Sequence, residues 1–249
     1  MADIYRSNAR PSSIYTGGNY TGGNSLSWGS GVDEQIPIKG WSYEGTAANQ
    51  SVLATVTLSR VSGLPIADIT RLLDEQPGSM RLDKLIRGLA NGDIKHPSWT
   101  DAARARLNAS ITLHSLAAQE PLRQPSSSYD WRLFESFIVA ELSGGSRETF
   151  MVLFLDTHYW LLSAEVLFMG SVDSAPVYTR VVASRALAHQ ATSVVVAHNH
   201  PSGVLKSSHS DVSVTEKLSK ARILLDIRLC DDLIAAEGHC VSLRNLGFV

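Results

Sequence analysis

The stretch VVVAHNHPSGVLKSSHSD, residues 194–211, joins a predicted core strand to a predicted helix through a polar loop. Three valines and an alanine form a short apolar run of the kind found in buried strands, so we expect a strand over residues 193–197. Pro201 turns the chain away, and residues 210–225 then predict a helix. A strand, a loop and a helix in this order indicate an α/β domain.

Four polar side chains of this stretch are expected to surround one cavity. Residues i and i+2 of a strand point to the same face, so His198 and His200 can aim both imidazoles at one point. Ser208 and Asp211 are three residues apart, which places them on one face of the helix that begins there. Two histidines and an aspartate are a credible set of zinc ligands, and three protein ligands leave a fourth position for water. The alternative is that these groups only make loop and capping hydrogen bonds at the strand end.

A zinc-activated water also needs a general base. Glu148, in SRETF, directly precedes a predicted core strand over residues 150–155, where its carboxylate can overhang a neighbouring strand end. Glu165, in SAEVLF on the next strand, is the rival candidate. Ser208 is expected to hydrogen-bond the oxyanion of a tetrahedral intermediate, and it also suits the N-cap of the helix that follows.

The C-terminal half alternates between strands and helices. The expected elements are a helix over 131–142, strands over 150–155 and 160–168, a helix over 180–189 capped by Thr179, and strands over 229–235 and 240–243 joined by a turn at Glu237 and Gly238. Strands interleaved with helices predict an α/β sandwich.

The upstream part divides into three segments. Residues 1–46 hold eight of the 18 glycines and a tandem YTGGN repeat, so we expect a flexible tail, or else a segment that orders on binding through its aromatic residues. Residues 47–119 predict short helices, the last running from Asp101 to about Ala118 with Thr100 as its N-cap. EPLRQPSSS, residues 120–128, predicts a linker to the α/β domain at 129–249.

Composition excludes several classes of protein. Residues 1–46, 47–128 and 129–249 carry net charges of −1, +2 and −3, which is not the strongly basic surface of a nucleic-acid binder. No apolar run approaches the roughly 20 residues that span a bilayer, and the start MADIYRSNARPSS lacks the apolar core of a secretory signal. Cys230 and Cys240 match no metal or redox spacing and are expected to be free thiols in a reducing cytoplasm.

The motif resembles a known family. His198-x-His200-Pro201, followed by Ser208 and Asp211, looks like the JAMM motif of MPN-domain metallopeptidases. The flanking sequence is similar to the bacterial RadC branch of that family over residues 129–249. It reads RETFMVLFLDTHYWLLSAEVLFMGSVDSAPVYTRVV and then AHNHPSG.

The resemblance implies an MPN fold, a cytidine-deaminase-like mixed sheet sandwiched by helices. It implies zinc as cofactor, His198, His200 and Asp211 as its ligands, Glu148 as base and Ser208 as oxyanion donor. Family members elsewhere cut isopeptide bonds of ubiquitin-like conjugates, whereas the RadC branch carries a DNA-repair name.

Two departures from the RadC pattern stand out. A histidine usually follows an aspartate after the motif's helix, but here the chain reads Cys230-Asp231-Asp232, so we expect a changed contact beside an intact metal site. Upstream, HPSWT stands where a helix-hairpin-helix region carries a glycine turn, and Trp99 does not easily replace glycine. Residues 47–119 are therefore expected to be a degenerate helix-hairpin-helix-like region, and DNA is the weaker candidate partner.

Three functions remain open from the sequence. The first is a zinc-dependent hydrolase acting on a protein or peptide substrate, with Glu148 as base. The second is a DNA repair or recombination accessory protein, against which the charge balance speaks. The third is an interaction module that holds zinc without turnover. Neither the substrate nor the oligomeric state is encoded in a recognisable pattern.

Overall fold

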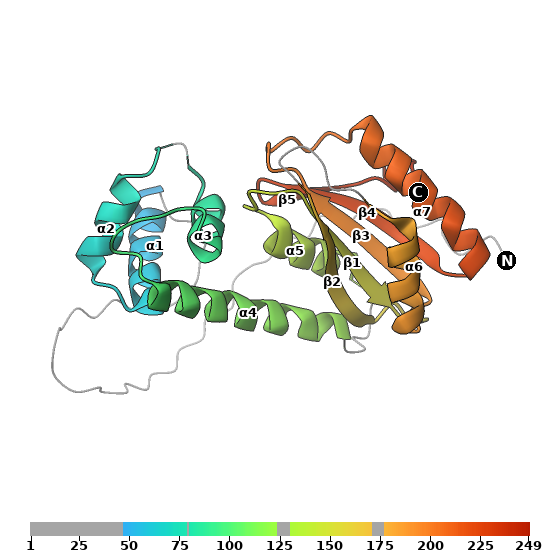
Figure 1. Ribbon diagram of the computed structural model, residues 1–249, viewed down its shortest axis with the longest axis horizontal. Coiled ribbons are helices and arrows are strands. Elements are labelled where there is room, and N and C mark those ends of the chain that lie inside the picture. Colours follow the sequence, from blue (N-terminus) through green and yellow to red (C-terminus); the bar gives the residue numbers. More distant parts are fainter. Residues whose placement is uncertain (1–46, 79, 124–129, 171–176) are drawn as a thin grey trace, which may run out of the picture. The chain divides into compact units, whose positions relative to one another are not determined.

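Figure 1 shows a computed structural model of the chain, which describes residues 47–78, 80–123, 130–170 and 177–249. Of residues 47–51 and 222–224 it describes the backbone alone. The predicted tail, residues 1–46, lies outside the described residues. Within the described part, no helix is long and apolar enough to cross a membrane.

Four helices lie within residues 47–123 and confirm the predicted helical region: α1 (Ala47–Ser62), α2 (Ile66–Asp74), α3 (Leu82–Asn91) and α4 (Asp101–Arg123). Thr100 caps α4 as predicted, because its hydroxyl accepts the N–H of Ala103 at 3.1 Å. Trp99 is buried in the apolar core of these helices and donates its indole N–H to the carbonyl of Leu89 at 3.2 Å. Trp99 thus contributes to packing.

The last of these helices is longer than predicted. We expected α4 to end near Ala118 and a linker to begin at residue 120, but the helix continues through Pro121 to Arg123. Leu122 explains the difference, since it is 3% exposed and packs in the core between α5 and the sheet. Burying a leucine stabilises by about 1.5–3 kcal/mol, comparable with the roughly 3 kcal/mol that an internal proline costs. The rest of the predicted linker, residues 124–128, lies outside the described residues.

The C-terminal half forms one mixed sheet. Its strands are β1 (Thr149–Leu155), β2 (Leu161–Met169), β3 (Ser193–Asn199), β4 (Arg228–Ala236) and β5 (His239–Ser242), in the spatial order β2-β1-β3-β4-β5. Only β3 and β4 are parallel, and the helix α7 (His209–Leu225) makes the crossover that parallel strands require. The turn at Glu237 and Gly238 is confirmed between β4 and β5. The predicted α/β class and mixed sheet are therefore correct.

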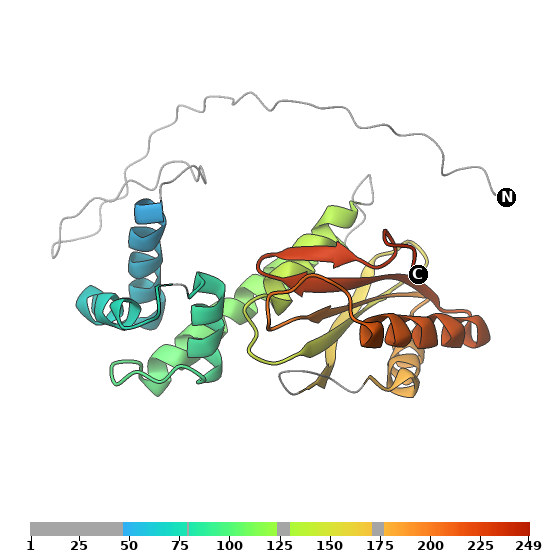
Figure 2. The ribbon, with the colours of Figure 1, turned by 90° about the horizontal axis from the view of Figure 1, so that it is seen from above.

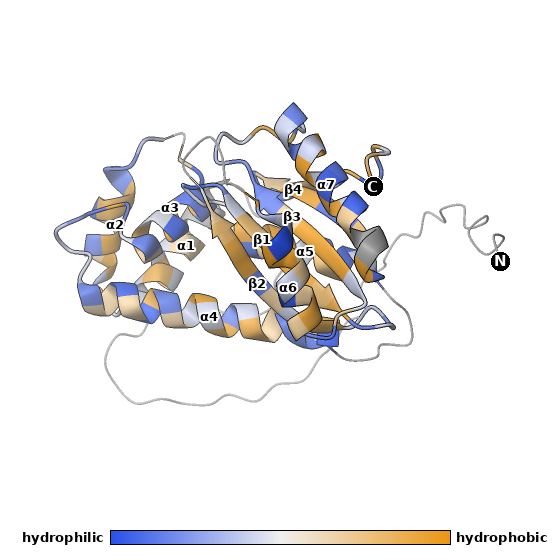
Figure 3. Cartoon of the chain, turned by 45° about the vertical axis from the view of Figure 1, so that its right-hand side comes forward, coloured by the Kyte–Doolittle hydropathy of each residue, from blue (hydrophilic) through white to orange (hydrophobic). Residues whose placement is uncertain are grey.

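Helices cover both faces of the sheet, as Figures 1 and 2 show. The helix α5 (Trp131–Leu142) packs on one face, and α6 (Thr179–Ala188) and α7 pack on the other. Successive residues of β1 alternate between the two cores: Phe150, Val152 and Phe154 face α6 and α7, whereas Met151, Leu153 and Leu155 face α5. Because both faces are covered, β1 and β3 are largely apolar and buried (Figure 3).

One predicted cap is wrong. Thr179 was expected to cap the helix that follows it, but α6 begins at Thr179 itself, and Tyr178 is the N-cap residue without a side-chain capping bond. A tyrosine hydroxyl cannot reach back to the first turn as threonine can, so this helix depends on packing of its buried residues Val182 and Ala186.

Candidate metal centre

The histidine-bearing end of β3 is an ordered strand. We expected this strand to end at Ala197, but it runs through His198 to Asn199, and the N–H of His200 still bonds to the carbonyl of Ala235 at 3.1 Å. His198 is only 4% exposed. Both imidazoles are thus carried by backbone that the sheet holds in place.

Asn199 performs a task that the sequence did not suggest. Its side-chain oxygen accepts the N–H of Thr149 at 2.7 Å, and its side-chain nitrogen donates to the carbonyl of Arg147 at 3.0 Å. These two hydrogen bonds hold the backbone on either side of Glu148 in place. The end of β3 therefore positions the segment that carries the candidate base. The position of Asn199 between His198 and His200 was the feature of the sequence that could have indicated a structural role.

The third candidate ligand is held by the start of α7. The Ser208 hydroxyl accepts the N–H of Asp211 at 3.2 Å, and the Asp211 carboxylate accepts the N–H of Ser208 at 2.6 Å. This capping box satisfies two first-turn N–H groups and fixes the carboxylate. The predicted N-cap role of Ser208 is thus present in the structure.

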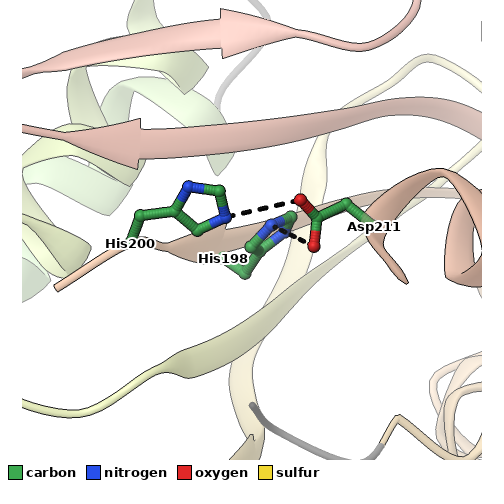
Figure 4. A group of neighbouring side chains, drawn as sticks. All are labelled: His198, His200 and Asp211. Carbon is green, nitrogen blue, oxygen red and sulfur yellow. Dashed lines mark ion pairs between the residues drawn. The ribbon is translucent and has the colours of Figure 1, made fainter. Parts of the chain in front are cut away.

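The three predicted ligands come together in space (Figure 4). The Nε2 of His198 and the Nε2 of His200 each lie 3.5 Å from a carboxylate oxygen of Asp211. One ligand atom from each residue can be chosen so that all three lie within 4.8 Å of one another. Zinc bonds of about 2.0–2.1 Å in a tetrahedron place neighbouring ligand atoms about 3.4 Å apart. The spacing therefore suits a zinc ion.

The hydrogen bonds of the imidazoles also suit a metal. Nδ1 of His200 lies 2.6 Å from the carbonyl of Val204, and a carbonyl only accepts, so this nitrogen carries the hydrogen. Nε2 of His200 is then left with its lone pair facing Asp211. His198 is buried, and neither of its ring nitrogens has a hydrogen-bond partner among the described residues. Two buried ring nitrogens without partners fit a site in which one nitrogen binds a cation and the other carries the hydrogen.

The electrostatics of the site show strong mutual attraction. Burial by itself would raise the pKa of Asp211, but His198, His200 and the Ser208 N–H together hold that pKa well below its usual range. Burial would likewise lower the pKa of His198, yet the carboxylates of Asp211 and Asp232 raise it above its usual value. The site thus favours a positive charge between its acidic groups, which a divalent cation can supply.

A cavity of about 320 Å³ lies over these residues, and the predicted base is one of the residues that line it. Glu148 lines it together with His198, His200 and Asp211. The rival Glu165 lies outside it, with its carboxylate 2.8 Å from Nε of Arg185 and 2.6 Å from Nε2 of His189. Position therefore favours Glu148 as the base.

Similarity to known proteins agrees with this geometry. Residues 129–248 match the RadC-like JAB domain family. The chain is 32% identical over 211 residues to a UPF0758 protein of Marinomonas sp. (strain MWYL1), covering 82% of this chain and 91% of the relative. It is 34% identical over 208 residues to a UPF0758 protein of Ectopseudomonas mendocina, covering 83% and 92% of the two chains. The chain is 30% identical over 221 residues to a UPF0758 protein of Shewanella oneidensis, covering 89% of this chain and 96% of the relative.

The names of these relatives state no activity. Their similarity extends beyond the JAB domain into the helical region, since it covers more than four fifths of the chain. The mixed sheet, the strand end that carries the two histidines and these matches together confirm the resemblance seen in the sequence. The chain belongs to the RadC-like JAB domain family.

Proposed function

We propose that this protein is a zinc-dependent hydrolase that cleaves amide or isopeptide bonds in protein or peptide substrates. The observation that carries the proposal is the convergence of His198 and His200 on the carboxylate of Asp211, at 3.5 Å each, inside a cavity that Glu148 also lines. A purely structural zinc site would be closed by a fourth protein ligand. Among the described residues only three ligating side chains gather here.

His198, His200 and Asp211 would hold the zinc ion. Zinc at such a site supplies Lewis acidity and makes water nucleophilic near neutral pH. Both imidazoles suit this role because each presents Nε2 toward Asp211, and the capping box holds the Asp211 carboxylate in place.

Glu148 is the proposed general base. It would accept a proton from the attacking water and deliver that proton to the leaving amine. Ser208 stands at the edge of the same cavity, where its hydroxyl can donate to the oxyanion while its lone pair caps α7. The two roles of Ser208 are compatible, since a hydroxyl both donates and accepts.

The test combines metal content with hydrolysis. We expect about one zinc per chain in the wild type and in Glu148→Gln, and none in the double variant His198→Ala/His200→Ala, by elemental analysis of purified protein. On a panel of peptide and isopeptide-linked substrates, Glu148→Gln should lose hydrolysis by about 10²- to 10⁴-fold. Glu165→Gln is the matched control, because it removes a carboxylate outside the cavity and should leave hydrolysis unchanged.

The other outcomes identify the alternative functions. A wild type that binds zinc but hydrolyses none of the panel would favour an interaction module. Binding to DNA that weakens steeply with salt would favour a nucleic-acid role instead. A chain that takes up no zinc, even from excess metal, would contradict the enzyme proposal.

A further inference from the structure

A third acidic side chain, Asp232, lines the same cavity as Glu148 and Asp211 and is not one of the predicted ligands. It stands on β4 opposite Val196, on the sheet face that also carries His198. Its side chain is 1% exposed. Its Oδ2 accepts the hydroxyl of Thr215 at 2.5 Å, whereas its Oδ1 has no hydrogen-bond partner among the described residues. A buried carboxylate is costly unless it is paired, so the unsatisfied oxygen requires a reason.

His198 lies between two carboxylates. Its Nε2 is 3.5 Å from Asp211 and its Nδ1 is 3.5 Å from Oδ1 of Asp232. A neutral imidazole carries one N–H and one lone pair, and the lone pair binds metal. With Nε2 directed at the metal site, the hydrogen belongs on Nδ1, which faces Asp232.

We propose that Asp232 is a positioning residue for the metal centre: it accepts the Nδ1–H of His198, holds the ring in the orientation that presents Nε2, and strengthens that nitrogen as a ligand. The inference rests on the proposed metal site but not on its catalytic activity. The separation of 3.5 Å between Nδ1 of His198 and Oδ1 of Asp232 is longer than a typical hydrogen bond, so the proposed bond requires a small shift of one of the two side chains.

The two histidines are thus oriented by different means. His200 donates its Nδ1–H to a backbone carbonyl, that of Val204. His198 has a carboxylate in the equivalent place, which makes the imidazole a stronger donor of electrons to a metal than a neutral acceptor does. Asp232 also adds a second buried negative charge beside Asp211, so two carboxylates face a site that would hold a dication.

Thr215 keeps the carboxylate in place. It is fully buried on α7, and its hydroxyl lies 2.9 Å from the carbonyl of Asp211 as well as 2.5 Å from Asp232. It therefore joins β4 to the helix that carries the third ligand. Replacing Thr215 with valine removes the donor while keeping the shape of the side chain.

The experiment measures zinc affinity, by competition with a chromophoric chelator, on Asp232→Asn, Asp232→Ala and Thr215→Val. Asn keeps an acceptor oxygen but loses the charge, and Ala loses both. We expect the dissociation constant to rise about 10- to 100-fold in Asp232→Ala, less in Asp232→Asn, and least in Thr215→Val. The visible absorption of the cobalt-loaded protein should change in the same order, because it reports the geometry of the ligands.

Asp231→Asn is the matched control. Asp231 is also a buried aspartate on β4, but its carboxylate accepts hydrogen bonds from the Ser242 hydroxyl and from the N–H groups of Asp232 and Arg244, and an asparagine oxygen can still accept from both N–H groups. The control should lose stability in the zinc-free state and keep its zinc affinity. Circular dichroism checks that each variant is folded.

Folded Asp232→Asn and Asp232→Ala proteins with wild-type zinc affinity and wild-type cobalt spectra would overturn the positioning role, even if hydrolysis fell. An equal loss of zinc affinity in Asp231→Asn would overturn it too, because the effect would then be one of general charge or folding. A wild-type chain that binds no zinc would overturn this inference together with the proposed function.

Discussion

Replacing Ser208 separates the two roles that this residue holds. Its hydroxyl caps α7 by accepting the Asp211 N–H at 3.2 Å, and the proposed function asks the same hydroxyl to donate to an oxyanion. Alanine removes both interactions. Glycine also removes the hydroxyl, but as an N-cap it is nearly as good as serine. Threonine retains both.

The magnitude follows from the capping box. Loss of a serine N-cap to alanine costs about 1 kcal/mol on average, within a range of roughly 0.5–2. Here the other half of the box survives, because the Ser208 N–H that donates to Asp211 belongs to the backbone. We therefore expect Ser208→Ala to lose about 1 kcal/mol of unfolding free energy, or about 2–4 °C in melting temperature for a chain of this size. Ser208→Gly should lose only a few tenths of a kcal/mol.

The assay is urea unfolding of the zinc-free proteins, followed by hydrolysis with zinc restored. If Ser208→Ala and Ser208→Gly unfold at the wild-type urea concentration, the capping argument is refuted. If Ser208→Gly also turns over as fast as the wild type, Ser208 has no oxyanion role, since loss of one such donor costs about 10²- to 10³-fold. Ser208→Thr should match the wild type in both measurements.

Two further predictions concern metal and pH. Zinc at a hundredfold excess over its dissociation constant should stabilise the wild type by about 2.7 kcal/mol, or about 5–10 °C in melting temperature, and should not shift His198→Ala/His200→Ala. If zinc raised the melting temperature of that double variant by the same amount, the ion would bind at a site other than His198 and His200. The second prediction concerns Glu165, whose pKa is lowered from 4.5 to about 2 by the hydrogen bond that Arg185 donates to its carboxylate. The stability that Glu165 contributes is therefore present above pH 4.5 and is lost as pH falls toward 2. The difference in melting temperature between wild type and Glu165→Gln should therefore shrink over that range, and a constant difference would contradict the ion pair.

The convergence of the candidate ligands was predictable because these residues lie close together in the sequence. Strand periodicity places His198 and His200 on one face, and helix spacing places Ser208 and Asp211 together, so a single stretch of 18 residues carries all four side chains. The α/β class followed from the alternation of apolar runs and amphipathic segments, and the structure confirms it. The predicted elements differ from the observed ones mainly at their ends, where packing decides the outcome.

What the sequence did not predict depends on contacts between distant segments. Asn199 bonds to the backbone of Arg147 and Thr149 at the start of β1, and although its place beside two histidines marks it as notable, the sequence does not indicate which segment it contacts. Leu122 extends α4 past a proline only because the core under α5 accepts it. The sequence shows that Asp232 stands where the RadC pattern usually has a histidine. It does not show that Asp232 faces His198, because that contact depends on the register of β4 beside β3.

The centre is also a junction between secondary structure elements. His198 belongs to β3, Asp211 to the first turn of α7, and Asp232 to β4. The Thr215 hydroxyl lies within hydrogen-bond distance of an acceptor on Asp211 and of one on Asp232, and its single hydrogen can be donated to either. Among the described residues, both ring nitrogens of His198 and Oδ1 of Asp232 are buried at this junction without a hydrogen-bond partner. Zinc would bind between β3 and α7 and permit the hydrogen bond from β3 to β4, so it should protect all three elements from local opening. Amide hydrogen exchange should therefore slow on zinc addition at the end of β3, the first turn of α7 and the middle of β4, and remain unchanged in α1 and α2. Protection confined to the loop over residues 201–207 would mean that the ion binds at the surface of the junction and does not hold it together.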